Sequence, residues 1–327
     1  MTVVAQSARI HPKGSFMNPA RIGLIGHGEV GHIFSAGLRA LPGVQQVNAW
    51  DTVFADATDG PARRLRAQDA GVKPCTSMQA LCEGSDLLIS AVTASNTLAV
   101  AREAAAFMRT GQVFLDLNSA SPGTKQQAAE AVQAVGADYV EAGVMTSVPP
   151  YGIRVPMLLG GPEAVALAAT LQRWGLDASV VSEQIGVASA IKMCRSVMIK
   201  GLEALVIESY TTARAYGVED HVLPTLVETF PSIDWNQQGA YFFSRVVQHG
   251  KRRAEEMRES AHTVREAGFE PLMTAAIAEK HQWVADCARE GTFEGVAGSH
   301  GKPARWQAYA DALLQARKND GVVKPRA

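Results

Sequence analysis

The sequence predicts an α/β domain built on a mostly parallel sheet, followed by an all-helical domain. From residue 21 to about residue 184, short apolar runs alternate with segments of helical periodicity, which is typical of a parallel sheet covered on both faces. Beyond this point the strand-like runs stop and only helical segments follow. The 327 residues are enough for two domains with buried cores.

The elements follow one another in a regular order. Apolar runs predict strands at 21–26, 44–51, 86–92, 111–118, 136–144, 155–161 and 177–183. Helical segments are expected between them at 29–41, 95–108, 122–135 and 162–174. The later helices are expected at 185–216, 219–229, 238–267, 271–289 and 302–317. We therefore place a flexible extension at 1–20, the α/β domain at 21–184 and the helical domain at 185–327.

The composition argues against several classes of protein. The formal net charge is −1, so nothing favours binding to nucleic acid or to an anionic membrane. The four cysteines form no CxxC pair and no histidine cluster has metal-ligand spacing, which argues against a disulfide framework and a metal site. No apolar run has the length of a signal peptide or a membrane span. We expect a cytoplasmic protein that acts on a small molecule.

A glycine loop follows the first predicted strand and opens the first helix. In "IGLIGHGEVGHIF", Gly26, Gly28 and Gly31 have the order G-x-G-x-x-G. We expect Gly26 to allow a tight turn, Gly28 to allow close approach of a pyrophosphate, and Gly31 to allow close helix-to-strand packing. N–H groups of the helix N-terminus would face the phosphates. This context predicts a dinucleotide-binding Rossmann domain; the competing interpretation is a tight turn without a ligand.

An acidic residue at the end of the second predicted strand strengthens this prediction. Asp51 has the spacing of the acid that accepts hydrogen bonds from the ribose hydroxyls, and its charge repels a 2′-phosphate. Arg63 and Arg64 fall in the following helical segment rather than beside Asp51. The sequence therefore favours NAD over NADP, with NADP possible, and the competing interpretation is an aspartate that merely ends a strand.

Four stretches in this order resemble the β-hydroxyacid dehydrogenase superfamily, the group of 3-hydroxyisobutyrate and 6-phosphogluconate dehydrogenases. They are "GLIGHGEVG", "DLNSASP" (116–122), "EAGVMTSVPPYG" (141–152) and "GVASAIKMCRS" (186–196). The chain is similar in particular to the branch with a DUF1932-type helical C-terminal domain. The resemblance implies an NAD(P)-dependent oxidoreductase and a homodimer.

The resemblance also implies contacts for individual residues. Ser119 would lie beside the substrate, although a serine here also suits an ordinary helix N-cap before Pro122. The implied cofactor contacts are Gly26, His27, Gly28, Glu29, Val30, Asp51, Val92, Thr93 and Asn118.

The substrate loop departs from the pattern of the superfamily. The usual Ser-Gly-Gly, whose N–H groups hold a substrate carboxylate, is replaced here by Thr146, Ser147 and the residues that follow. The two hydroxyls can still donate hydrogen bonds, but Pro149 and Pro150 have no N–H. With Tyr151 as an aromatic wall, these changes favour a substrate bulkier than a small hydroxyacid.

The segment "SAIKMCRSVMIKGLEAL" (189–205) matches the lysine helix of the superfamily. Lys192 matches the acid/base lysine, and Ser196 stands four residues on, on the same face, where the pattern has asparagine. A lysine can take the hydroxyl proton during hydride removal when burial or another cation lowers its pKa, and Arg195 and Lys200 share its arc. The competing interpretation is a solvated polar face of an amphipathic helix.

The superfamily carries a second lysine near the substrate and nicotinamide, and the spacing does not show which residue matches it here. The candidates are Lys251, Arg252 and Arg253, and for any one of them a basic, solvated helix start is an equal alternative.

The predicted activity is hydride transfer between nicotinamide and the alcohol carbon of a hydroxyacid-like substrate, with Lys192 moving the proton. The alternatives are an imine reductase, a decarboxylating 3-hydroxyacid dehydrogenase, and a non-catalytic NAD-binding sensor.

Overall fold

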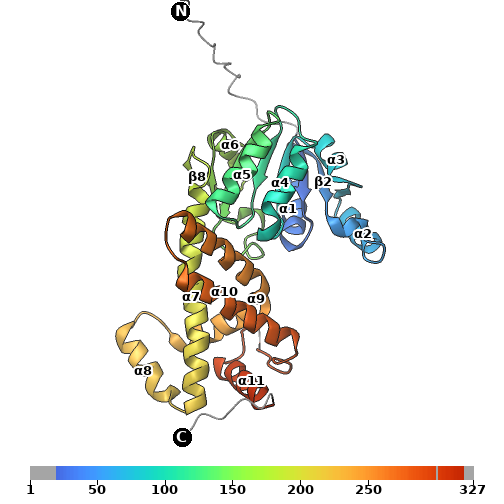
Figure 1. Ribbon diagram of the computed structural model, residues 1–327. Helices are drawn as coiled ribbons and strands as arrows, with labels where there is room; N and C mark the ends of the chain where they lie inside the picture. The colour runs from blue at the N-terminus through green and yellow to red at the C-terminus, as the bar shows by residue number, and fades with distance from the viewer. Residues whose placement is uncertain (1–19, 300, 320–327) are drawn as a thin grey trace, which may run out of the picture. The chain divides into compact units, whose positions relative to one another are not determined.

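The computed structural model describes residues 20–299 and 301–319, so the predicted extension lies outside it except for Ala20. Contacts within the chain divide it into two compact units, here called unit 1, which ends at Lys192, and unit 2, which begins at Met193 (Figure 1). The predicted fold class is confirmed, because the mostly parallel sheet lies in unit 1 and unit 2 is helical.

Unit 1 is built on an eight-stranded sheet with the order β3-β2-β1-β4-β5-β6-β7-β8. Neighbouring strands are parallel except for β6 and β7, which pair antiparallel. The strands are β1 (Ala20–Ile25), β2 (Val44–Trp50), β3 (Lys73–Pro74), β4 (Leu87–Ser90), β5 (Val113–Asp116), β6 (Asp138–Val144), β7 (Met157–Gly160) and β8 (Ala178–Ser182). The strand order reverses between β1 and β4, the position at which open α/β sheets bind ligands.

Both faces of the sheet are covered, because successive side chains of a strand point to opposite sides. In β4, Leu87 and Ile89 pack in one core with Phe34 of α1, whereas Leu88 packs in a second core with Phe114. The helices of unit 1 are α1 (Glu29–Arg39), α2 (Gly60–Asp69), α3 (Met78–Glu83), α4 (Thr97–Ala105), α5 (Pro122–Gln133) and α6 (Ala164–Arg173), with 3-10 turns η1 (Thr52–Ala55), η2 (Ala94–Asn96) and η3 (Gly152–Arg154).

Unit 2 is formed by helices that pack on the main part of α7 (Figure 1). Its helices are α7 (Val187–Tyr216), which begins in unit 1, α8 (Glu219–Thr229), α9 (Trp235–Glu266), α10 (Leu272–Arg289) and α11 (Trp306–Asn319). Tyr210, Phe243 and Trp306 lie at the centre of its largest apolar core. The chain bends within α9 at His249, whose φ of −133° and ψ of 15° are not helical. No helix in the described parts of the chain has an apolar stretch long enough to cross a bilayer.

Candidate functional site

Five parallel strand ends share one edge of unit 1. β2, β1, β4, β5 and β6 are consecutive and parallel, so their carboxyl ends lie side by side. Four strand spacings make this row about 19 Å long, a length suited to a dinucleotide laid along the edge. The structure therefore brings together the predicted residues that follow these strands: Asp51, the glycine loop, Val92 with Thr93, Asn118 with Ser119, and Thr146 with Ser147.

The three glycines of the loop have different steric surroundings. Gly26 has a φ of +87°, and a Cβ there would lie 2.6 Å from the carbonyl oxygen of Ala91. A Cβ at Gly31 would collide with the carbonyl oxygen of Gly26, so only glycine lets α1 pack this close to the turn. A Cβ at Gly28 would meet no atom within 4 Å. The space in front of Gly28 is thus open to a ligand, while the other two glycines are required by the fold.

Asp51 connects the end of β2 to the glycine loop. Its Oδ2 accepts a hydrogen bond from the N–H of His27 at 2.7 Å, and its Oδ1 accepts one from the N–H of Val53 at 3.0 Å. Asp51 therefore does more than end a strand, because it holds the loop and caps η1. Each carboxylate oxygen has a second lone pair, which leaves capacity to accept from a ribose hydroxyl.

The side chain of His27 turns towards α1. Its Nε2 lies 3.2 Å from the hydroxyl of Ser35, and its ring packs at 5.7 Å from the ring of Phe54. Burial, with the nearby His32, lowers the pKa of His27, which favours the neutral imidazole. The ring of His27 and its N–H are therefore both engaged within the chain, the ring with Ser35 and the N–H with Asp51. The exposed Glu29 opens α1, and the half-buried Val30 packs on the core.

Asn118 joins the loops after β4 and β5. Its Oδ1 accepts from the N–H of Val92 at 2.7 Å, and its Nδ2 donates to the hydroxyl of Ser90 at 2.9 Å. Thr93 follows Val92 in the same loop, where its hydroxyl accepts from Nδ2 of Asn96 at 2.9 Å. Asn118 is only 4% exposed, so its amide holds the two strand ends in place.

A buried ion pair lies directly beneath Asn118. Lys125 and Asp116 are both 0% exposed, and Nζ of Lys125 lies 2.8 Å from Oδ1 of Asp116. The same carboxylate accepts from the N–H of Asn118 at 2.9 Å and from the hydroxyl of Tyr139 at 2.6 Å. Burial and the carboxylate of Asp116 raise the pKa of Tyr139, which therefore stays a hydrogen-bond donor. This network fixes the turn that presents Asn118 and Ser119.

The predicted substrate-side hydroxyls are accessible. The helix after β5 is capped by Ser121, whose hydroxyl accepts from the N–H of Thr124 at 3.2 Å, so Ser119 has no capping role. Ser119 is half-buried at the strand end. After β6, Thr146 is exposed and Ser147 is half-buried. All three side chains can meet a ligand on this edge.

A carboxylate on β6 holds the start of α7. Glu141 is fully buried and accepts from the N–H groups of Gly186 at 2.7 Å, Ala188 at 3.0 Å and Ser189 at 3.3 Å. The hydroxyl of Ser189 also donates to it at 2.7 Å. These donors belong to the helix N-terminus, where N–H groups lack helical partners and the macrodipole favours a negative charge.

Lys192 lies where α7 passes over the end of β6. A Cβ at Gly143 would lie 2.9 Å from the carbonyl oxygen of Ala188 and 3.5 Å from Cβ of Lys192, so glycine is what permits this close packing. Lys192 is half-buried and is the last residue of unit 1. Its stem is therefore held at the same strand edge as Thr146 and Ser147.

Further along α7, the polar arc is buried within unit 2. Ser196 and Lys200 are each 6% exposed, and Nζ of Lys200 lies 3.2 Å from the hydroxyl of Ser196 and 2.9 Å from a carboxylate oxygen of Glu256. The interpretation of this arc as a solvated helix face is therefore wrong for these residues. The helical pattern alone indicates that this polar arc faces solvent, but α9 packs against it and buries it.

A second ion pair lies one turn further on. Arg253 donates to Glu203 at 2.7 Å, and Nε2 of the fully buried His281 lies 3.8 Å from the other oxygen of Glu203. Among the basic candidates of α9, Arg253 faces this interior, whereas Lys251 is exposed and Arg252 is paired with Glu256 at 3.8 Å. Burial raises the pKa of Glu203 and, together with Arg253, lowers the pKa of His281 to about 3.

Comparison with known proteins identifies the relatives of this chain. The model of the NAD binding domain of 6-phosphogluconate dehydrogenase matches residues 21–170, and that of DUF1932, a domain of unknown function, matches residues 213–284. A conserved hypothetical protein from Sinorhizobium meliloti is 34% identical, with 91% of this chain and 96% of that chain covered and a TM-score of 0.69. The chain belongs to the β-hydroxyacid dehydrogenase superfamily, in the branch with a DUF1932 domain.

Two further solved structures are similar to this chain. The conserved protein MTH1747, described as similar in structure to 3-hydroxyacid dehydrogenases, is 30% identical over 83% of this chain and 98% of its own, with a TM-score of 0.63. The 3-hydroxyisobutyrate dehydrogenase of Mycobacterium tuberculosis, solved with L-serine, is 14% identical over 92% of this chain and 100% of its own, with a TM-score of 0.65, and this likeness shows the fold alone.

The residues at the strand edge fit the NAD(P) of this superfamily. No side chain caps the N-terminus of α1, the space at Gly28 is open, and Asp51 follows β2. Together they offer N–H groups to a pyrophosphate and an acceptor to a ribose. In the described parts of the chain, no three metal-ligating side chains come together.

Two positioning residues, Glu141 and Lys125, were not predicted from the sequence. Glu141 lies inside a stretch that carries the superfamily resemblance, but it acts on residues more than 40 positions away. Two features together could have identified it. A glutamate inside a buried strand needs hydrogen-bond donors, and the later helix that starts after Gly186 has N–H donors without a side-chain cap. The sequence has no comparable signal for Lys125. Its pairing with Asp116 cannot be predicted locally, because only the folded sheet brings the two side chains together.

Proposed function

We propose that the protein is an NAD(P)-dependent oxidoreductase that transfers a hydride between nicotinamide and the alcohol carbon of a hydroxyacid-like substrate. The observation that carries this proposal is the position of Lys192. It lies on the Glu141-capped start of α7, against Gly143 at the end of β6. The same edge holds the glycine loop and Ser119. Membership of the superfamily supports the reaction class.

Lys192 would serve as the acid/base group. When bound, the nicotinamide ring accepts or returns the hydride. In the oxidation direction, Nζ of Lys192 takes the proton of the substrate hydroxyl as the C–H electron pair leaves, so a carbonyl remains. In reduction the same nitrogen returns the proton. The hydroxyls of Ser119, Thr146 and Ser147 would donate to the substrate and orient it. Ser196, predicted to contact the substrate, is instead paired with Lys200 inside unit 2 and has no role in this proposal.

The substrate proposed here is larger than a small hydroxyacid. Pro149 and Pro150 are exposed beside Thr146 and offer no N–H for a carboxylate. Tyr151 is 52% exposed and supplies an apolar wall next to them. For the cofactor, we propose a preference for NAD, because the charge of Asp51 disfavours a 2′-phosphate.

The exposed side of α7 supports a homodimer. Met198 and Leu205 are 66% and 55% exposed and stand seven residues apart, on one face of the helix. Large apolar side chains in such a line favour burial against another chain. We propose a second copy of this chain as the partner.

The experiment that tests the function compares wild type with Lys192→Ala on a panel of hydroxyacids, with NAD and NADP, by NAD(P)H absorbance. We expect kcat to fall about 100- to 10,000-fold in Lys192→Ala with cofactor affinity unchanged, since only the proton-transfer group is lost. Lys192→Arg should be equally impaired, because arginine keeps the charge but does not release a proton. Lys73→Ala, on the exposed β3, is the matched control.

Each alternative gives a different result in the same assay. Turnover with cyclic imines and none with hydroxyacids would indicate an imine reductase. Release of CO₂ with hydride transfer would indicate a decarboxylating dehydrogenase. Cofactor binding without turnover on any substrate would indicate a sensor. Wild-type turnover in Lys192→Ala would contradict the assignment of Lys192.

A further inference from the structure

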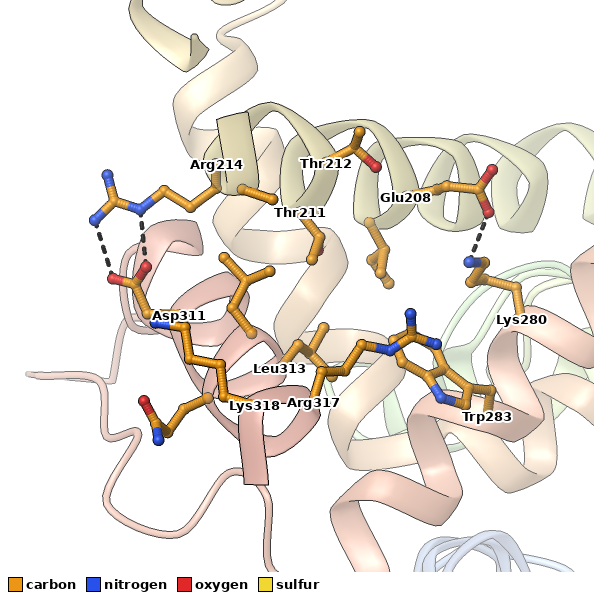
Figure 2. A pocket seen from close by; sticks show the side chains of 14 residues that line it. Glu208, Thr211, Thr212, Arg214, Lys280, Trp283, Asp311, Leu313, Arg317 and Lys318 are labelled. Carbon is orange, nitrogen blue, oxygen red and sulfur yellow. Dashed lines mark hydrogen bonds and ion pairs between the residues drawn. The ribbon is translucent and has the colours of Figure 1, made fainter. Parts of the chain in front are cut away.

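A pocket of about 880 Å³ lies entirely within unit 2 (Figure 2). It is formed by the second half of α7, one turn of α10 and the helix α11. Its volume falls in the range of sites for organic ligands. None of the residues placed in the proposed hydride-transfer site lines it. The proposed function therefore leaves this pocket without a role.

The walls of the pocket combine apolar and aromatic surface. Ile207 of α7 and Leu313 of α11 are buried at 0% and 2% exposure, and the half-buried Trp283 of α10 faces them. Figure 2 shows the Trp283 ring with the side chain of Arg317 drawn over it. A flat or branched apolar body would bury against these three residues.

The charged residues of the wall leave an excess of cations. Lys280 is paired with Glu208 at 2.6 Å. Arg214 is paired with Asp311 through contacts of 2.8 Å and 3.1 Å, so both carboxylates of the wall are neutralised. Arg317 and Lys318 also line the pocket, and neither has a carboxylate partner in the described parts of the chain.

Two of the cations lie against the indole of Trp283. Nζ of Lys280 is 5.1 Å from the ring centroid, and the guanidinium carbon of Arg317 is 6.0 Å from it. Positive groups at this distance from an indole are held by its quadrupole, which positions Arg317 at the wall. The hydroxyl of Thr211 is a further polar group of the wall, and among the described residues it has no hydrogen-bond partner.

We propose that this pocket binds an organic anion with an apolar body. Ile207, Leu313 and Trp283 contact the body of the ligand. Arg317 and Lys318 bind its carboxylate, sulfonate or phosphate, and the hydroxyl of Thr211, unpartnered within the described parts of the chain, supplies a further hydrogen-bond donor in the wall. The pocket is a binding site in addition to the dinucleotide edge of unit 1.

The test uses 8-anilinonaphthalene-1-sulfonate as the anionic probe and N-phenyl-1-naphthylamine as the same body without the sulfonate. Fluorescence titration of the full chain, with saturating NAD present, should give one saturable sulfonate site per chain and at least tenfold weaker binding of the neutral probe. Arg317→Glu combined with Lys318→Glu should weaken sulfonate binding at least tenfold. Thr211→Val should weaken it a few-fold.

Two variants separate the pocket from other sites. Ala215→Trp fills the pocket without changing its charge and should abolish binding. Arg305→Glu, an exposed charge reversal just before α11, should leave binding unchanged. Circular dichroism and thermal melts confirm that each variant is folded. Sulfonate binding that survives both Ala215→Trp and the Arg317/Lys318 reversal would overturn the proposal. So would binding that is detected only after residues 320–327 are removed, because the tail would then be the occupant.

Discussion

Glu141 is a buried carboxylate whose charge is compensated by a helix N-terminus rather than by a cation. Three N–H groups and one hydroxyl donate to it, at 2.7 to 3.3 Å. Hydrogen bonds to an ionised group are worth about 1.5–3 kcal/mol each, and an isolated buried charge would be unstable without them. The carboxylate therefore fixes the start of α7 on β6, and with it the stem of Lys192.

The first prediction concerns Glu141→Gln. The substitution keeps the size of the side chain but turns an NH₂ group towards N–H donors, so we expect the free energy of unfolding to fall by about 2–3 kcal/mol. Urea denaturation measures this change. Glu130→Gln, on the exposed side of α5, is the control and should change stability by less than about 0.5 kcal/mol. Equal stability of wild type and Glu141→Gln would show that the carboxylate does not hold the helix.

At the scale of single residues, the sequence predicted what local backbone geometry requires. Gly26 and Gly31 follow from a turn that admits no Cβ, so their spacing alone points to the loop. Glu141 and Lys125 act through partners that are distant in the sequence or fixed only by the fold. No local pattern encodes such pairs, because the sheet register decides which side chains meet.

At the scale of elements, α7, α9 and α10 enclose a cluster of charges within unit 2. Lys200 pairs with Glu256, Arg253 pairs with Glu203, and His281 lies beside Glu203 without a hydrogen bond to either ring nitrogen among the described residues. Breaking one member of a buried pair costs about 3–5 kcal/mol, so these pairs fix how the three helices pack. His281 contributes no charge because burial keeps it neutral.

The second prediction is a pH dependence from His281. Its pKa is about 3 in the folded protein, below the ordinary value of 6.5. Between these values the unfolded chain binds a proton that the folded chain does not, so stability falls as the pH falls. We expect about 2–3 kcal/mol to be lost through this group between pH 6.5 and pH 4.5. Urea unfolding at several pH values measures it.

Replacement of His281 separates its contribution to the pH dependence of stability from that of Glu203. The pKa of Glu203 is raised in the folded protein, so this residue makes stability rise as the pH falls. His281→Leu should have a flatter acid profile than wild type, since leucine cannot take up the proton. His221→Leu, an exposed position on α8, should keep the wild-type profile. Parallel profiles for wild type and His281→Leu would show that His281 does not titrate with unfolding.

The elements that the sequence missed are the short ones. The predicted strands and long helices are present. β3 and α3 were not expected, and α2 was expected only as a helical segment around Arg63 and Arg64, without bounds. β3 has two residues, and in α2 the apolar Leu65 is 57% exposed, so neither element shows a core-facing period. Their positions come from packing against β2 and η1, which only the folded sheet provides.

At the scale of the whole molecule, one continuous helix belongs to both units. α7 carries Lys192 at the end of unit 1, and its later turns carry Ser196 and the buried ion pairs of unit 2. The sequence placed the change from α/β to helical structure at 184/185, and contacts divide the chain at 192/193, within the helix. The helical pattern predicts where the helix begins, but not how far into it the packing of unit 1 extends.

The last prediction concerns the oligomeric state that α7 supports. Met198 and Leu205 are exposed on a helix whose opposite arc is buried in unit 2, and the proposed dimer covers them with a second chain. Met198→Glu with Leu205→Glu places two like charges in that contact, and we expect the proposed dimer to dissociate to monomer, as measured by light scattering after gel filtration. Val165→Glu, a single apolar side chain that is 58% exposed on α6, should leave the mass unchanged. A wild-type monomer, or a dimer that survives the double substitution, would contradict this interface. A dimer that dissociates while cofactor binding persists would assign the exposed face of α7 to assembly and the strand edge of unit 1 to the cofactor.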